Sequence, residues 1–236
     1  MPKSKGNSKK NRRQQSSSEK TSRALSWALR HQAVAIGLTI TPDGYVPVQE
    51  ILDSKHPKLQ GISLESIQQM VETNDKQRFK LAQRPKSAYY QTQHDDDDEE
   101  TILCIRANQG HSLSVIDPTL LLNPLSQEEL ERLPCIIHGT YAEPWKIIST
   151  TGLKKMTRTH IHFASGLPEA DGVISGMRKT CTVHIYINAK KCAQNHIQFY
   201  KSDNGVILTA GIDGILPCEY FSHVTDSNGQ ILLDNR

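Results

Sequence analysis

Ser63-Leu-Glu-Ser-Ile-Gln-Gln-Met-Val-Glu-Thr-Asn74 is the stretch that decides the fold of the first half of the chain. Its apolar residues recur at helical spacing, and Ser63 is a common helix N-cap, so the stretch predicts an amphipathic helix ending near Asn74. Upstream, the sequence predicts a helix from Glu19 to about Gln32, two short extended pieces around Asp43-Gly44, and a helix from Val48 to about Ser54.

Downstream of this helix, residues 78–81 and 102–105 alternate in polarity like two paired strands. A long insert, about 83–100, joins them and ends in six consecutive acids, Asp95 to Glu100. Such a run repels itself and does not hold ligands at fixed geometry, so we expect a solvated loop rather than a cation site. The order of helix, small strand, two helices and strand pair is that of a winged helix. A winged helix binds nucleic acid in some proteins and contacts a protein partner in others.

The charge of the chain is unevenly distributed. The sequence has 236 residues, 22% of them charged, and a formal net charge of +3. Residues 1–20 carry seven Lys or Arg against one Glu. Residues 1–18 are too polar to bury a core, so we expect a disordered basic tail, which could attract RNA or simply be solvated. The mild basicity of the remainder permits a polyanionic partner without requiring one.

Two features indicate an intracellular protein. No run of about 18 apolar residues exists, and no apolar segment follows the basic N-terminus, so neither a membrane span nor a signal peptide is expected. The five cysteines are scattered, odd in number and free of a CxxC motif, which favours free thiols in a reducing compartment. We expect a nuclear or cytoplasmic protein, or one present in both compartments.

The second half of the chain begins after a break near 118–134. Ser126 and Glu129 form a capping box that opens a short helix. A strand is expected at 135–137, with His138-Gly-Thr140 at its end. Thr140 and Glu143 form a second capping box for a helix that Gly152 ends. The rest predicts short, mostly antiparallel strands, with a helix near 168–176. The expected strands are 161–164, 182–187, 196–200, 206–208 and 214–216.

Several familiar chemistries are disfavoured by the sequence. It contains no GxSxG elbow, no P-loop and no GxGxxG. Cys181 and His184 have zinc-like spacing together with Cys192 and His196, but residues 181 and 184 fall on opposite faces of a strand. We therefore expect no metal site. If the protein binds a nucleotide, it must do so without a P-loop or a GxGxxG loop.

The pieces that remain resemble, in order, the NAD-dependent tRNA 2′-phosphotransferase family, whose members remove the splice-junction 2′-phosphate from ligated tRNA. The resemblance covers about residues 19 to 225 and leaves out the tail and the acidic insert. It is carried by Leu29-Arg30-His31, the run 105–112 (IRANQGHS), His138-Gly-Thr140, Arg158-Thr-His-Ile-His-Phe-Ala164, Ser175-Gly-Met-Arg178, the run 205–209 (GVILT) and the run 213–220 (DGILPCEY).

The resemblance implies an α+β protein of two lobes. Residues 19–120 would form a winged-helix lobe that binds RNA. Residues 121–236 would form a mostly antiparallel, β-rich lobe of the ADP-ribosyltransferase type that binds NAD. In that fold HisGlyThr faces the nicotinamide ribose and amide, and His162 lies near the nicotinamide. Protein-modifying relatives carry a catalytic Glu where this chain has Val206 or its neighbour Ile207, and no acid occurs at 205–208. The implied NAD-binding residues are His138, Gly139, Thr140, Gly152, His160, His162, Ser165 and Val206.

The resemblance also implies a catalytic set of Arg30, His31, Arg106 and Arg178. Guanidinium groups suit a phosphate monoester because they are always charged and donate in pairs. The implied RNA and phosphate contacts are Arg30, Arg106, Asn108, His111 and Arg178.

The implied reaction has two transesterification steps and needs no metal. The RNA 2′-phosphate attacks the nicotinamide-ribose carbon of NAD and expels nicotinamide, leaving an RNA-phospho-ADP-ribose intermediate. The ribose 2″-hydroxyl then attacks that phosphate, which releases 2′-OH RNA and ADP-ribose 1″,2″-cyclic phosphate. The first nucleophile is already anionic, so no general base is required. In the second step the arginines would stabilise the developing charge, and His31 is the donor that titrates near pH 7.

Two alternatives from other classes remain. One is NAD-dependent ADP-ribosylation of nucleic-acid terminal phosphates, which would stop at the first adduct. The other is a non-catalytic RNA-binding protein. In the main interpretation the partners are NAD and a tRNA with an internal 2′-phosphate, with no membrane, and the protein is a monomer.

Overall fold

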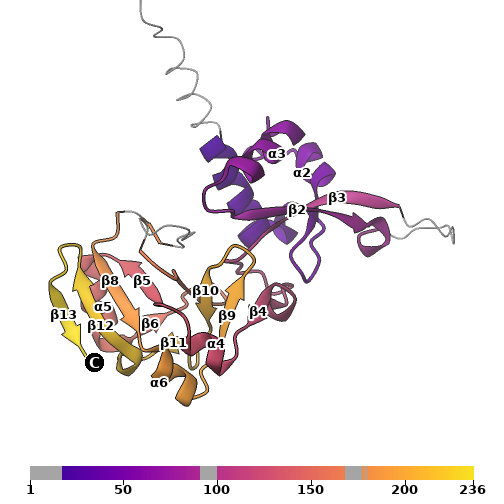
Figure 1. The fold of residues 1–236 in the computed structure, drawn as a ribbon. Helices are drawn as coiled ribbons and strands as arrows, with labels where there is room; N and C mark the ends of the chain where they lie inside the picture. The colour runs from indigo at the N-terminus through magenta and orange to yellow at the C-terminus, as the bar shows by residue number, and fades with distance from the viewer. Residues whose placement is uncertain (1–17, 91–99, 168–176, 179) are drawn as a thin grey trace, which may run out of the picture. The chain divides into compact units, whose positions relative to one another are not determined.

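The computed structural model describes residues 18–90, 100–167, 177–178 and 180–236, which fall into two compact units (Figure 1). Unit 1 comprises the described residues up to Ala107 together with Leu113–Asp117, and unit 2 comprises Asn108–Ser112 and Pro118–Arg236. Over the described residues the fold is α+β with several antiparallel sheets and few helices, as the sequence predicted. The basic tail, the acidic run 95–100 and the helix expected at 168–176 lie almost wholly outside the described residues. The insert expected at about 83–100 begins later than predicted, because the preceding strand continues to Pro85, and its residues 91–99 lie outside the described residues.

Unit 1 packs its helices on a small sheet of strand order β1-β3-β2. The predicted helices and the predicted strand pair are confirmed. A helix over 18–27 continues into a π-helical turn at the expected end of the helix. The elements are η1 (Ala28–Gln32), η2 (Val34–Ile36), β1 (Val46–Pro47), α2 (Val48–Asp53), α3 (Leu64–Thr73), β2 (Phe79–Pro85), η3 (Lys86–Ala88) and β3 (Thr101–Ala107).

The opening stretch of the sequence forms α3 as its pattern predicts. Ser63 accepts a hydrogen bond from the Ser66 amide, and Ser66 accepts one in return, so the first turn is closed by a capping box. Ile67 and Met70 are buried on the inner face, where they join the core of unit 1 with Leu29 and Ile105. This packing fixes η1 and β3 in one core, and both elements carry predicted site residues.

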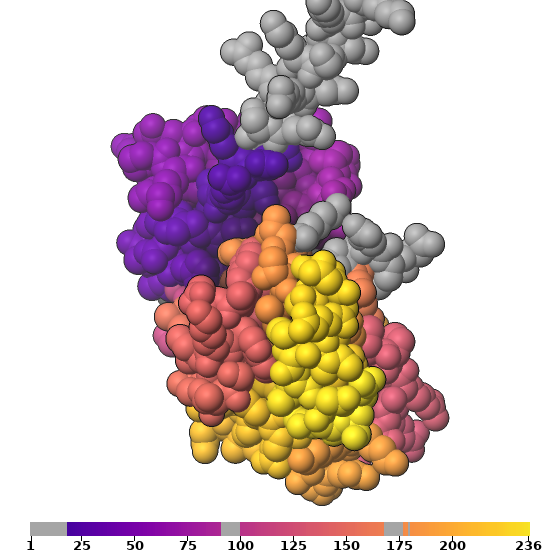
Figure 2. Space-filling model, turned by 90° about the vertical axis from the view of Figure 1, so that its left-hand side faces the viewer, coloured from indigo at the N-terminus to yellow at the C-terminus, as the bar shows by residue number. Residues whose placement is uncertain are grey.

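Unit 2 is built mainly from two four-stranded antiparallel sheets, β4-β9-β10-β7 and β13-β12-β8-β5. The edge strand β13 exposes Ile231 and Leu232, and the C-terminal segment forms part of the surface in Figure 2. The elements are η4 (Pro118–Leu120), β4 (Leu122–Pro124), α4 (Gln127–Glu131), β5 (Ile137–Thr140), α5 (Ala142–Thr151), β6 (Leu153–Lys154), β7 (Ile161–Phe163), β8 (Val183–Ile187), α6 (Ala189–Gln194), β9 (Phe199–Ser202), β10 (Ile207–Thr209), β11 (Ile215–Leu216), η5 (Cys218–Tyr220), β12 (Phe221–Asp226) and β13 (Ile231–Asp234).

Two local predictions around the HisGlyThr motif are wrong. The strand does not end before His138, because β5 runs from Ile137 to Thr140 and pairs with β8 along its whole length. Thr140 therefore does not cap the next helix. Its carbonyl accepts a hydrogen bond from the Thr182 amide (2.9 Å), and Tyr141 occupies the N-cap without a side-chain bond. Ladder pairing with β8 prevails over the local capping signal.

Other parts of the unit 2 prediction are confirmed or displaced. The Ser126 and Glu129 capping box is present, and α5 ends at Gly152 as expected. The strand expected at 196–200 begins at Phe199, because residues 195–196 form a turn in which His196 has φ 55°. The sequence analysis missed α6, β12 and β13. No helix among the described residues is long and apolar enough to cross a membrane.

Candidate functional site

His138 lies in β5 and is tied to the neighbouring strand β7. Its Nδ1 lies 2.9 Å from the backbone carbonyl oxygen of His162. A carbonyl only accepts, so Nδ1 carries the proton and donates it. Burial lowers the pKa of His138, the bond to His162 opposes this, and the nearby Arg158 charge lowers the pKa further. The imidazole is therefore neutral at neutral pH, and Nε2 is its acceptor.

Gly139 allows the segment with Met177 to pack against β5. A methyl group at residue 139 would overlap the Met177 side chain and meet the Cys181 Sγ at 2.9 Å. Met177 and Cys181 are buried, at 5% and 8% exposure. Only glycine fits this close approach without displacing them. Packing against Met177 and Cys181 thus explains why residue 139 is glycine, and the local sequence did not reveal this contact.

His162 and Val206 are brought to the same face by strand register. In the pairing of β7 with β10, His162 lies opposite Leu208, and Phe163 lies opposite Ile207. Successive residues of a strand point to opposite faces. Val206, two residues before Leu208, thus shares the His162 face. Ile207 packs with Phe163 in the core of unit 2. The register favours Val206 over Ile207 as the aliphatic residue of the predicted site.

His160 and Ser165 flank these positions and are held by local contacts. His160 is 5% exposed, its Nδ1 lies 2.9 Å from the Thr159 Oγ1, and its ring meets Tyr200 edge-on at 5.4 Å between centroids. Burial, and then the charge of Lys155, lower the pKa of His160 to about 4, so His160 is also neutral at pH 7. Ser165 is held through its backbone, since its carbonyl accepts a hydrogen bond from the Cys135 thiol (3.2 Å).

Asn108 and His111 group with unit 2 rather than with the strand that they follow. Both are buried, at 5% and 2% exposure. The His111 carbonyl accepts a hydrogen bond from the Thr159 amide (3.2 Å). The segment after β3 is thereby anchored to the run that leads into β7. The structure thus brings His111 into contact with the 158–162 motif.

Two exposed arginines lie close together in unit 2. The pKa of Arg158 is lowered by partial desolvation and then by the charge of Arg178. Arg158 also acts on His138 electrostatically. The sequence analysis quoted Arg158 within the motif but did not assign it a role. Its position two residues before His160 was the available signal. His138, Arg158 and Arg178 thus form one electrostatic group.

Gly152, one of the predicted NAD-binding residues, is also required by the local backbone. It ends α5 with φ 78° and ψ 174°. A Cβ there would lie 2.6 Å from the Leu216 carbonyl oxygen. This conformation and close approach require glycine irrespective of any ligand.

Unit 1 carries the remaining three members of the predicted set. Arg30 and His31 lie in the last turn of η1, which packs against β3. Arg106 lies in β3 and is 7% exposed. Its Nη1 donates to the Asp43 carbonyl oxygen (3.2 Å), and its Cζ lies 4.9 Å from the centre of the Tyr45 ring. These three residues come from two packed elements of one core.

A cavity lies elsewhere on unit 1. It is lined by 35–38, Glu50 and 53–56, none of which is a predicted site residue. The described residues contain no group of three or more His, Cys, Asp or Glu side chains that could hold a metal ion.

Comparison with known proteins identifies the class. The family model described as "RNA 2'-phosphotransferase, Tpt1 / KptA family" matches residues 16–211. The chain belongs to this family, and its members are transferases, as the sequence motifs indicated.

Individual relatives cover most of the chain. A protein from Danio rerio named "tRNA 2'-phosphotransferase 1" is 42% identical over 214 residues, which is 90% of this chain and 87% of the relative. A Saccharomyces cerevisiae protein named "tRNA 2'-phosphotransferase" is 36% identical over 195 residues, 81% of this chain and 78% of the relative. A Schizosaccharomyces pombe relative is 43% identical over 214 residues, 90% of this chain, and the chain spans about half (53%) of that relative's length.

Proposed function

We propose that this protein transfers the splice-junction 2′-phosphate of ligated tRNA to NAD. The products would be 2′-OH RNA, nicotinamide and ADP-ribose 1″,2″-cyclic phosphate. Family membership and the names of the relatives support the removal of a tRNA 2′-phosphate. The use of NAD, the two-step route and the residue roles are our proposal. So is the assignment of unit 1 as the winged-helix RNA lobe and unit 2 as the ADP-ribosyltransferase-like lobe.

The observation that carries the proposal is the chemical make-up of the candidate site. The predicted residues include arginines and histidines and no carboxylate. Of the histidines, His138 and His160 are held neutral by burial. Arginines suit a phosphate dianion, and neutral imidazoles suit uncharged hydroxyl and amide groups. A carboxylate would repel the incoming phosphate.

The residues of unit 2 fit NAD as a second substrate. His138 donates from Nδ1 to β7, so its Nε2 can accept from a ribose hydroxyl. Val206 lies on the strand face of His162 and is buried at 1% exposure, so it would form an apolar backing beside a nicotinamide ring near His162. Arg158 and Arg178 supply positive charge for phosphates. NAD itself supplies the electrophilic carbon and the ribose hydroxyl of the reaction.

The arginines share two tasks in this reaction. The 2′-phosphate is already anionic, so Arg30 and Arg106 need only orient it for attack on the ribose carbon. When the ribose 2″-hydroxyl attacks the phosphorus and the RNA 2′-oxygen leaves, charge develops on the phosphoryl oxygens. Arg106 and Arg178 would stabilise this charge more than that of the ground state. The 2″-hydroxyl would lose its proton as it attacks, and His31 would donate one to the leaving RNA oxygen, so the step leaves the number of protons unchanged. Such phosphates arise inside cells, so a nuclear or cytoplasmic location is part of the proposal.

The test is incubation of the purified protein with a short RNA carrying one internal 2′-phosphate, with and without NAD, followed by mass analysis of the RNA and the small products. We expect NAD-dependent loss of the phosphate together with nicotinamide and the cyclic ADP-ribose phosphate. RNA that keeps an added ADP-ribose would instead indicate an enzyme that stops after the first step. No reaction would favour a non-catalytic RNA-binding protein.

The role of Arg106 is tested by Arg106→Ala. We expect turnover to fall by about 10²-fold or more, since guanidinium groups aimed at developing charge contribute on that scale. NAD binding, measured by calorimetry, should stay within about twofold, since less than 0.5 kcal/mol is at stake. Arg132→Ala is the matched control, because Arg132 is an exposed arginine whose side chain is 80% accessible. Wild-type turnover in Arg106→Ala would exclude the role.

A further inference from the structure

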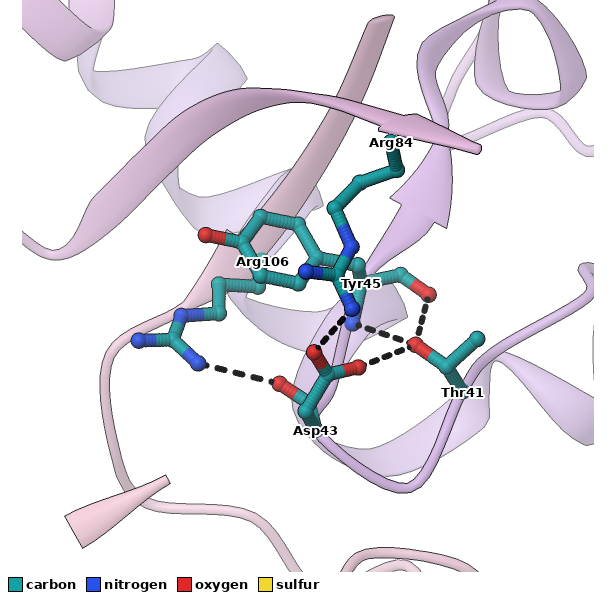
Figure 3. A network of polar contacts seen from close by, with 5 residues as sticks. All are labelled: Thr41, Asp43, Tyr45, Arg84 and Arg106. Carbon is teal, nitrogen blue, oxygen red and sulfur yellow. Dashed lines mark hydrogen bonds and ion pairs between the residues drawn. The ribbon is translucent and has the colours of Figure 1, made fainter. Parts of the chain in front are cut away.

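Arg106 lies within a polar network that joins four other residues of unit 1 (Figure 3). The network centres on the turn Thr41-Pro-Asp-Gly44, in which the Gly44 amide donates to the Thr41 carbonyl (2.8 Å). Gly44 has φ +84°, a conformation that glycine adopts without strain. The turn therefore presents the Asp43 carbonyl to Arg106 and the Asp43 carboxylate to other partners.

The Asp43 carboxylate is fixed by two bonds that do not involve Arg106. Arg84 Nη2 donates to Asp43 Oδ2 (2.6 Å), and the Thr41 hydroxyl donates to Asp43 Oδ1 (2.5 Å). The Asp43 side chain is 17% exposed and that of Arg84 is 35% exposed. Charge-assisted bonds of this length are among the stronger ones in proteins. They hold the turn while Arg106 bonds to its neutral carbonyl.

Strand register places both arginines beside one aromatic ring. Arg84 lies opposite Ile102, which is four residues from Arg106 on β3, so Arg84 and Arg106 share a face of the sheet. The guanidinium carbon of each lies 4.9 Å from the centre of the Tyr45 ring, which is buried at 5% exposure. Both cations are attracted to the ring, although they repel one another. The Asp43 carboxylate offsets that repulsion.

We propose that Arg84, Asp43 and Tyr45 are positioning residues that hold the Arg106 guanidinium ready for the RNA phosphate. Arg84 takes up the Asp43 carboxylate, which keeps that anion from neutralising Arg106. The Asp43 carbonyl and the Tyr45 ring then set the plane of the Arg106 guanidinium. This inference rests on the proposed function, since it assigns Arg106 to the 2′-phosphate.

The experiment measures how strongly the full chain prefers a 2′-phosphorylated RNA over the same RNA with a 2′-hydroxyl, as a ratio of dissociation constants. Arg84→Gln should reduce the ratio about tenfold, since small displacements of a positioning group are costly. Arg84→Lys should keep part of the wild-type ratio, because lysine can still pair with Asp43. Asp43→Asn should also reduce the ratio, because it removes the other partner of the same ion pair. Lys86→Gln is the matched control, because Lys86 follows the same strand and forms an exposed ion pair with Glu100. It should leave the ratio unchanged.

A double-mutant cycle separates positioning from direct contact and from general destabilisation. In an Arg106→Gln background, Arg84→Gln should have little further effect on the ratio. An equal effect in both backgrounds would overturn the proposal, because Arg84 would then act without Arg106. A wild-type protein that shows no preference for the phosphorylated RNA would overturn the proposed function instead. A clear wild-type preference that Arg106→Gln removes and that neither Arg84→Gln nor Asp43→Asn reduces would overturn the positioning role alone. Thermal unfolding identifies any variant that fails to fold. If Arg84→Gln does not fold, Asp43→Asn replaces it in the double-mutant cycle.

Discussion

Gly152→Ala separates a structural glycine from a ligand-binding one. Gly152 was predicted to bind NAD, yet its φ of 78° and ψ of 174° lie in a region that is essentially restricted to glycine. Strain of this kind costs about 1–3 kcal/mol. The new methyl group would also lie 2.6 Å from the Leu216 carbonyl oxygen and 3.1 Å from the Pro217 Cα. Such overpacking costs about 1–3 kcal/mol more.

The two costs together are about 2–6 kcal/mol, which lowers the unfolding midpoint by roughly 5–20 °C in a protein of this size. Gly229→Ala is the matched control. Gly229 has φ +83° with no atom within 4 Å of the added methyl group, so only the backbone strain of about 1–2 kcal/mol applies. The measurement is thermal unfolding by circular dichroism, with the KM for NAD measured below the transition. Equal midpoints for the two variants would refute the steric argument. A stable Gly152→Ala protein with a raised KM for NAD would support the predicted ligand-binding role.

Two further predictions concern pH and capping. The pKa of His160 is lowered to about 4 by burial, so the unfolded state binds the proton first as the pH falls. Stability should be fully present above about pH 6.5 and fall by up to about 3 kcal/mol towards pH 4, and His160→Gln should flatten this slope in denaturant titrations. Ser126→Ala removes the capping box of α4 and should lower the free energy of unfolding by about 1 kcal/mol, measured in urea. Glu131→Ala on the same helix should cost less than half as much, and a reversed order would contradict the capping argument.

Elements with strong local signals were predictable from the sequence. The helix at Leu64–Thr73 follows from its periodicity and from Ser63, and α4 follows from its capping box, because both signals act within one helical turn. Strands β12 and β13 were missed. In β12 only every third residue is buried, and β13 has no buried residue and pairs only at the sheet edge, so neither strand shows the alternation of a half-buried strand.

The candidate site was only partly predictable, for a related reason. Collinear motifs pointed to HisGlyThr and to the arginine set, but they did not distinguish Val206 from Ile207. That choice depends on the register of β10 against β7, which a one-residue shift would reverse. The Thr140 capping signal was overruled by pairing with β8, since a full ladder bond prevails over a local side-chain bond.

The sequence by itself determined the α+β class, the boundaries of α3 and α4, and the residue types that suit a phosphate and a ribose. Only the tertiary structure decided which tautomer His138 adopts, why residue 139 must be glycine, and how Arg84 reaches Asp43 across 41 residues of chain. Capping and periodicity act over a few residues, and side-chain chemistry is set by residue type. Tautomers, close approaches and ion pairs depend on contacts between distant segments, which exist only after the sheets have formed.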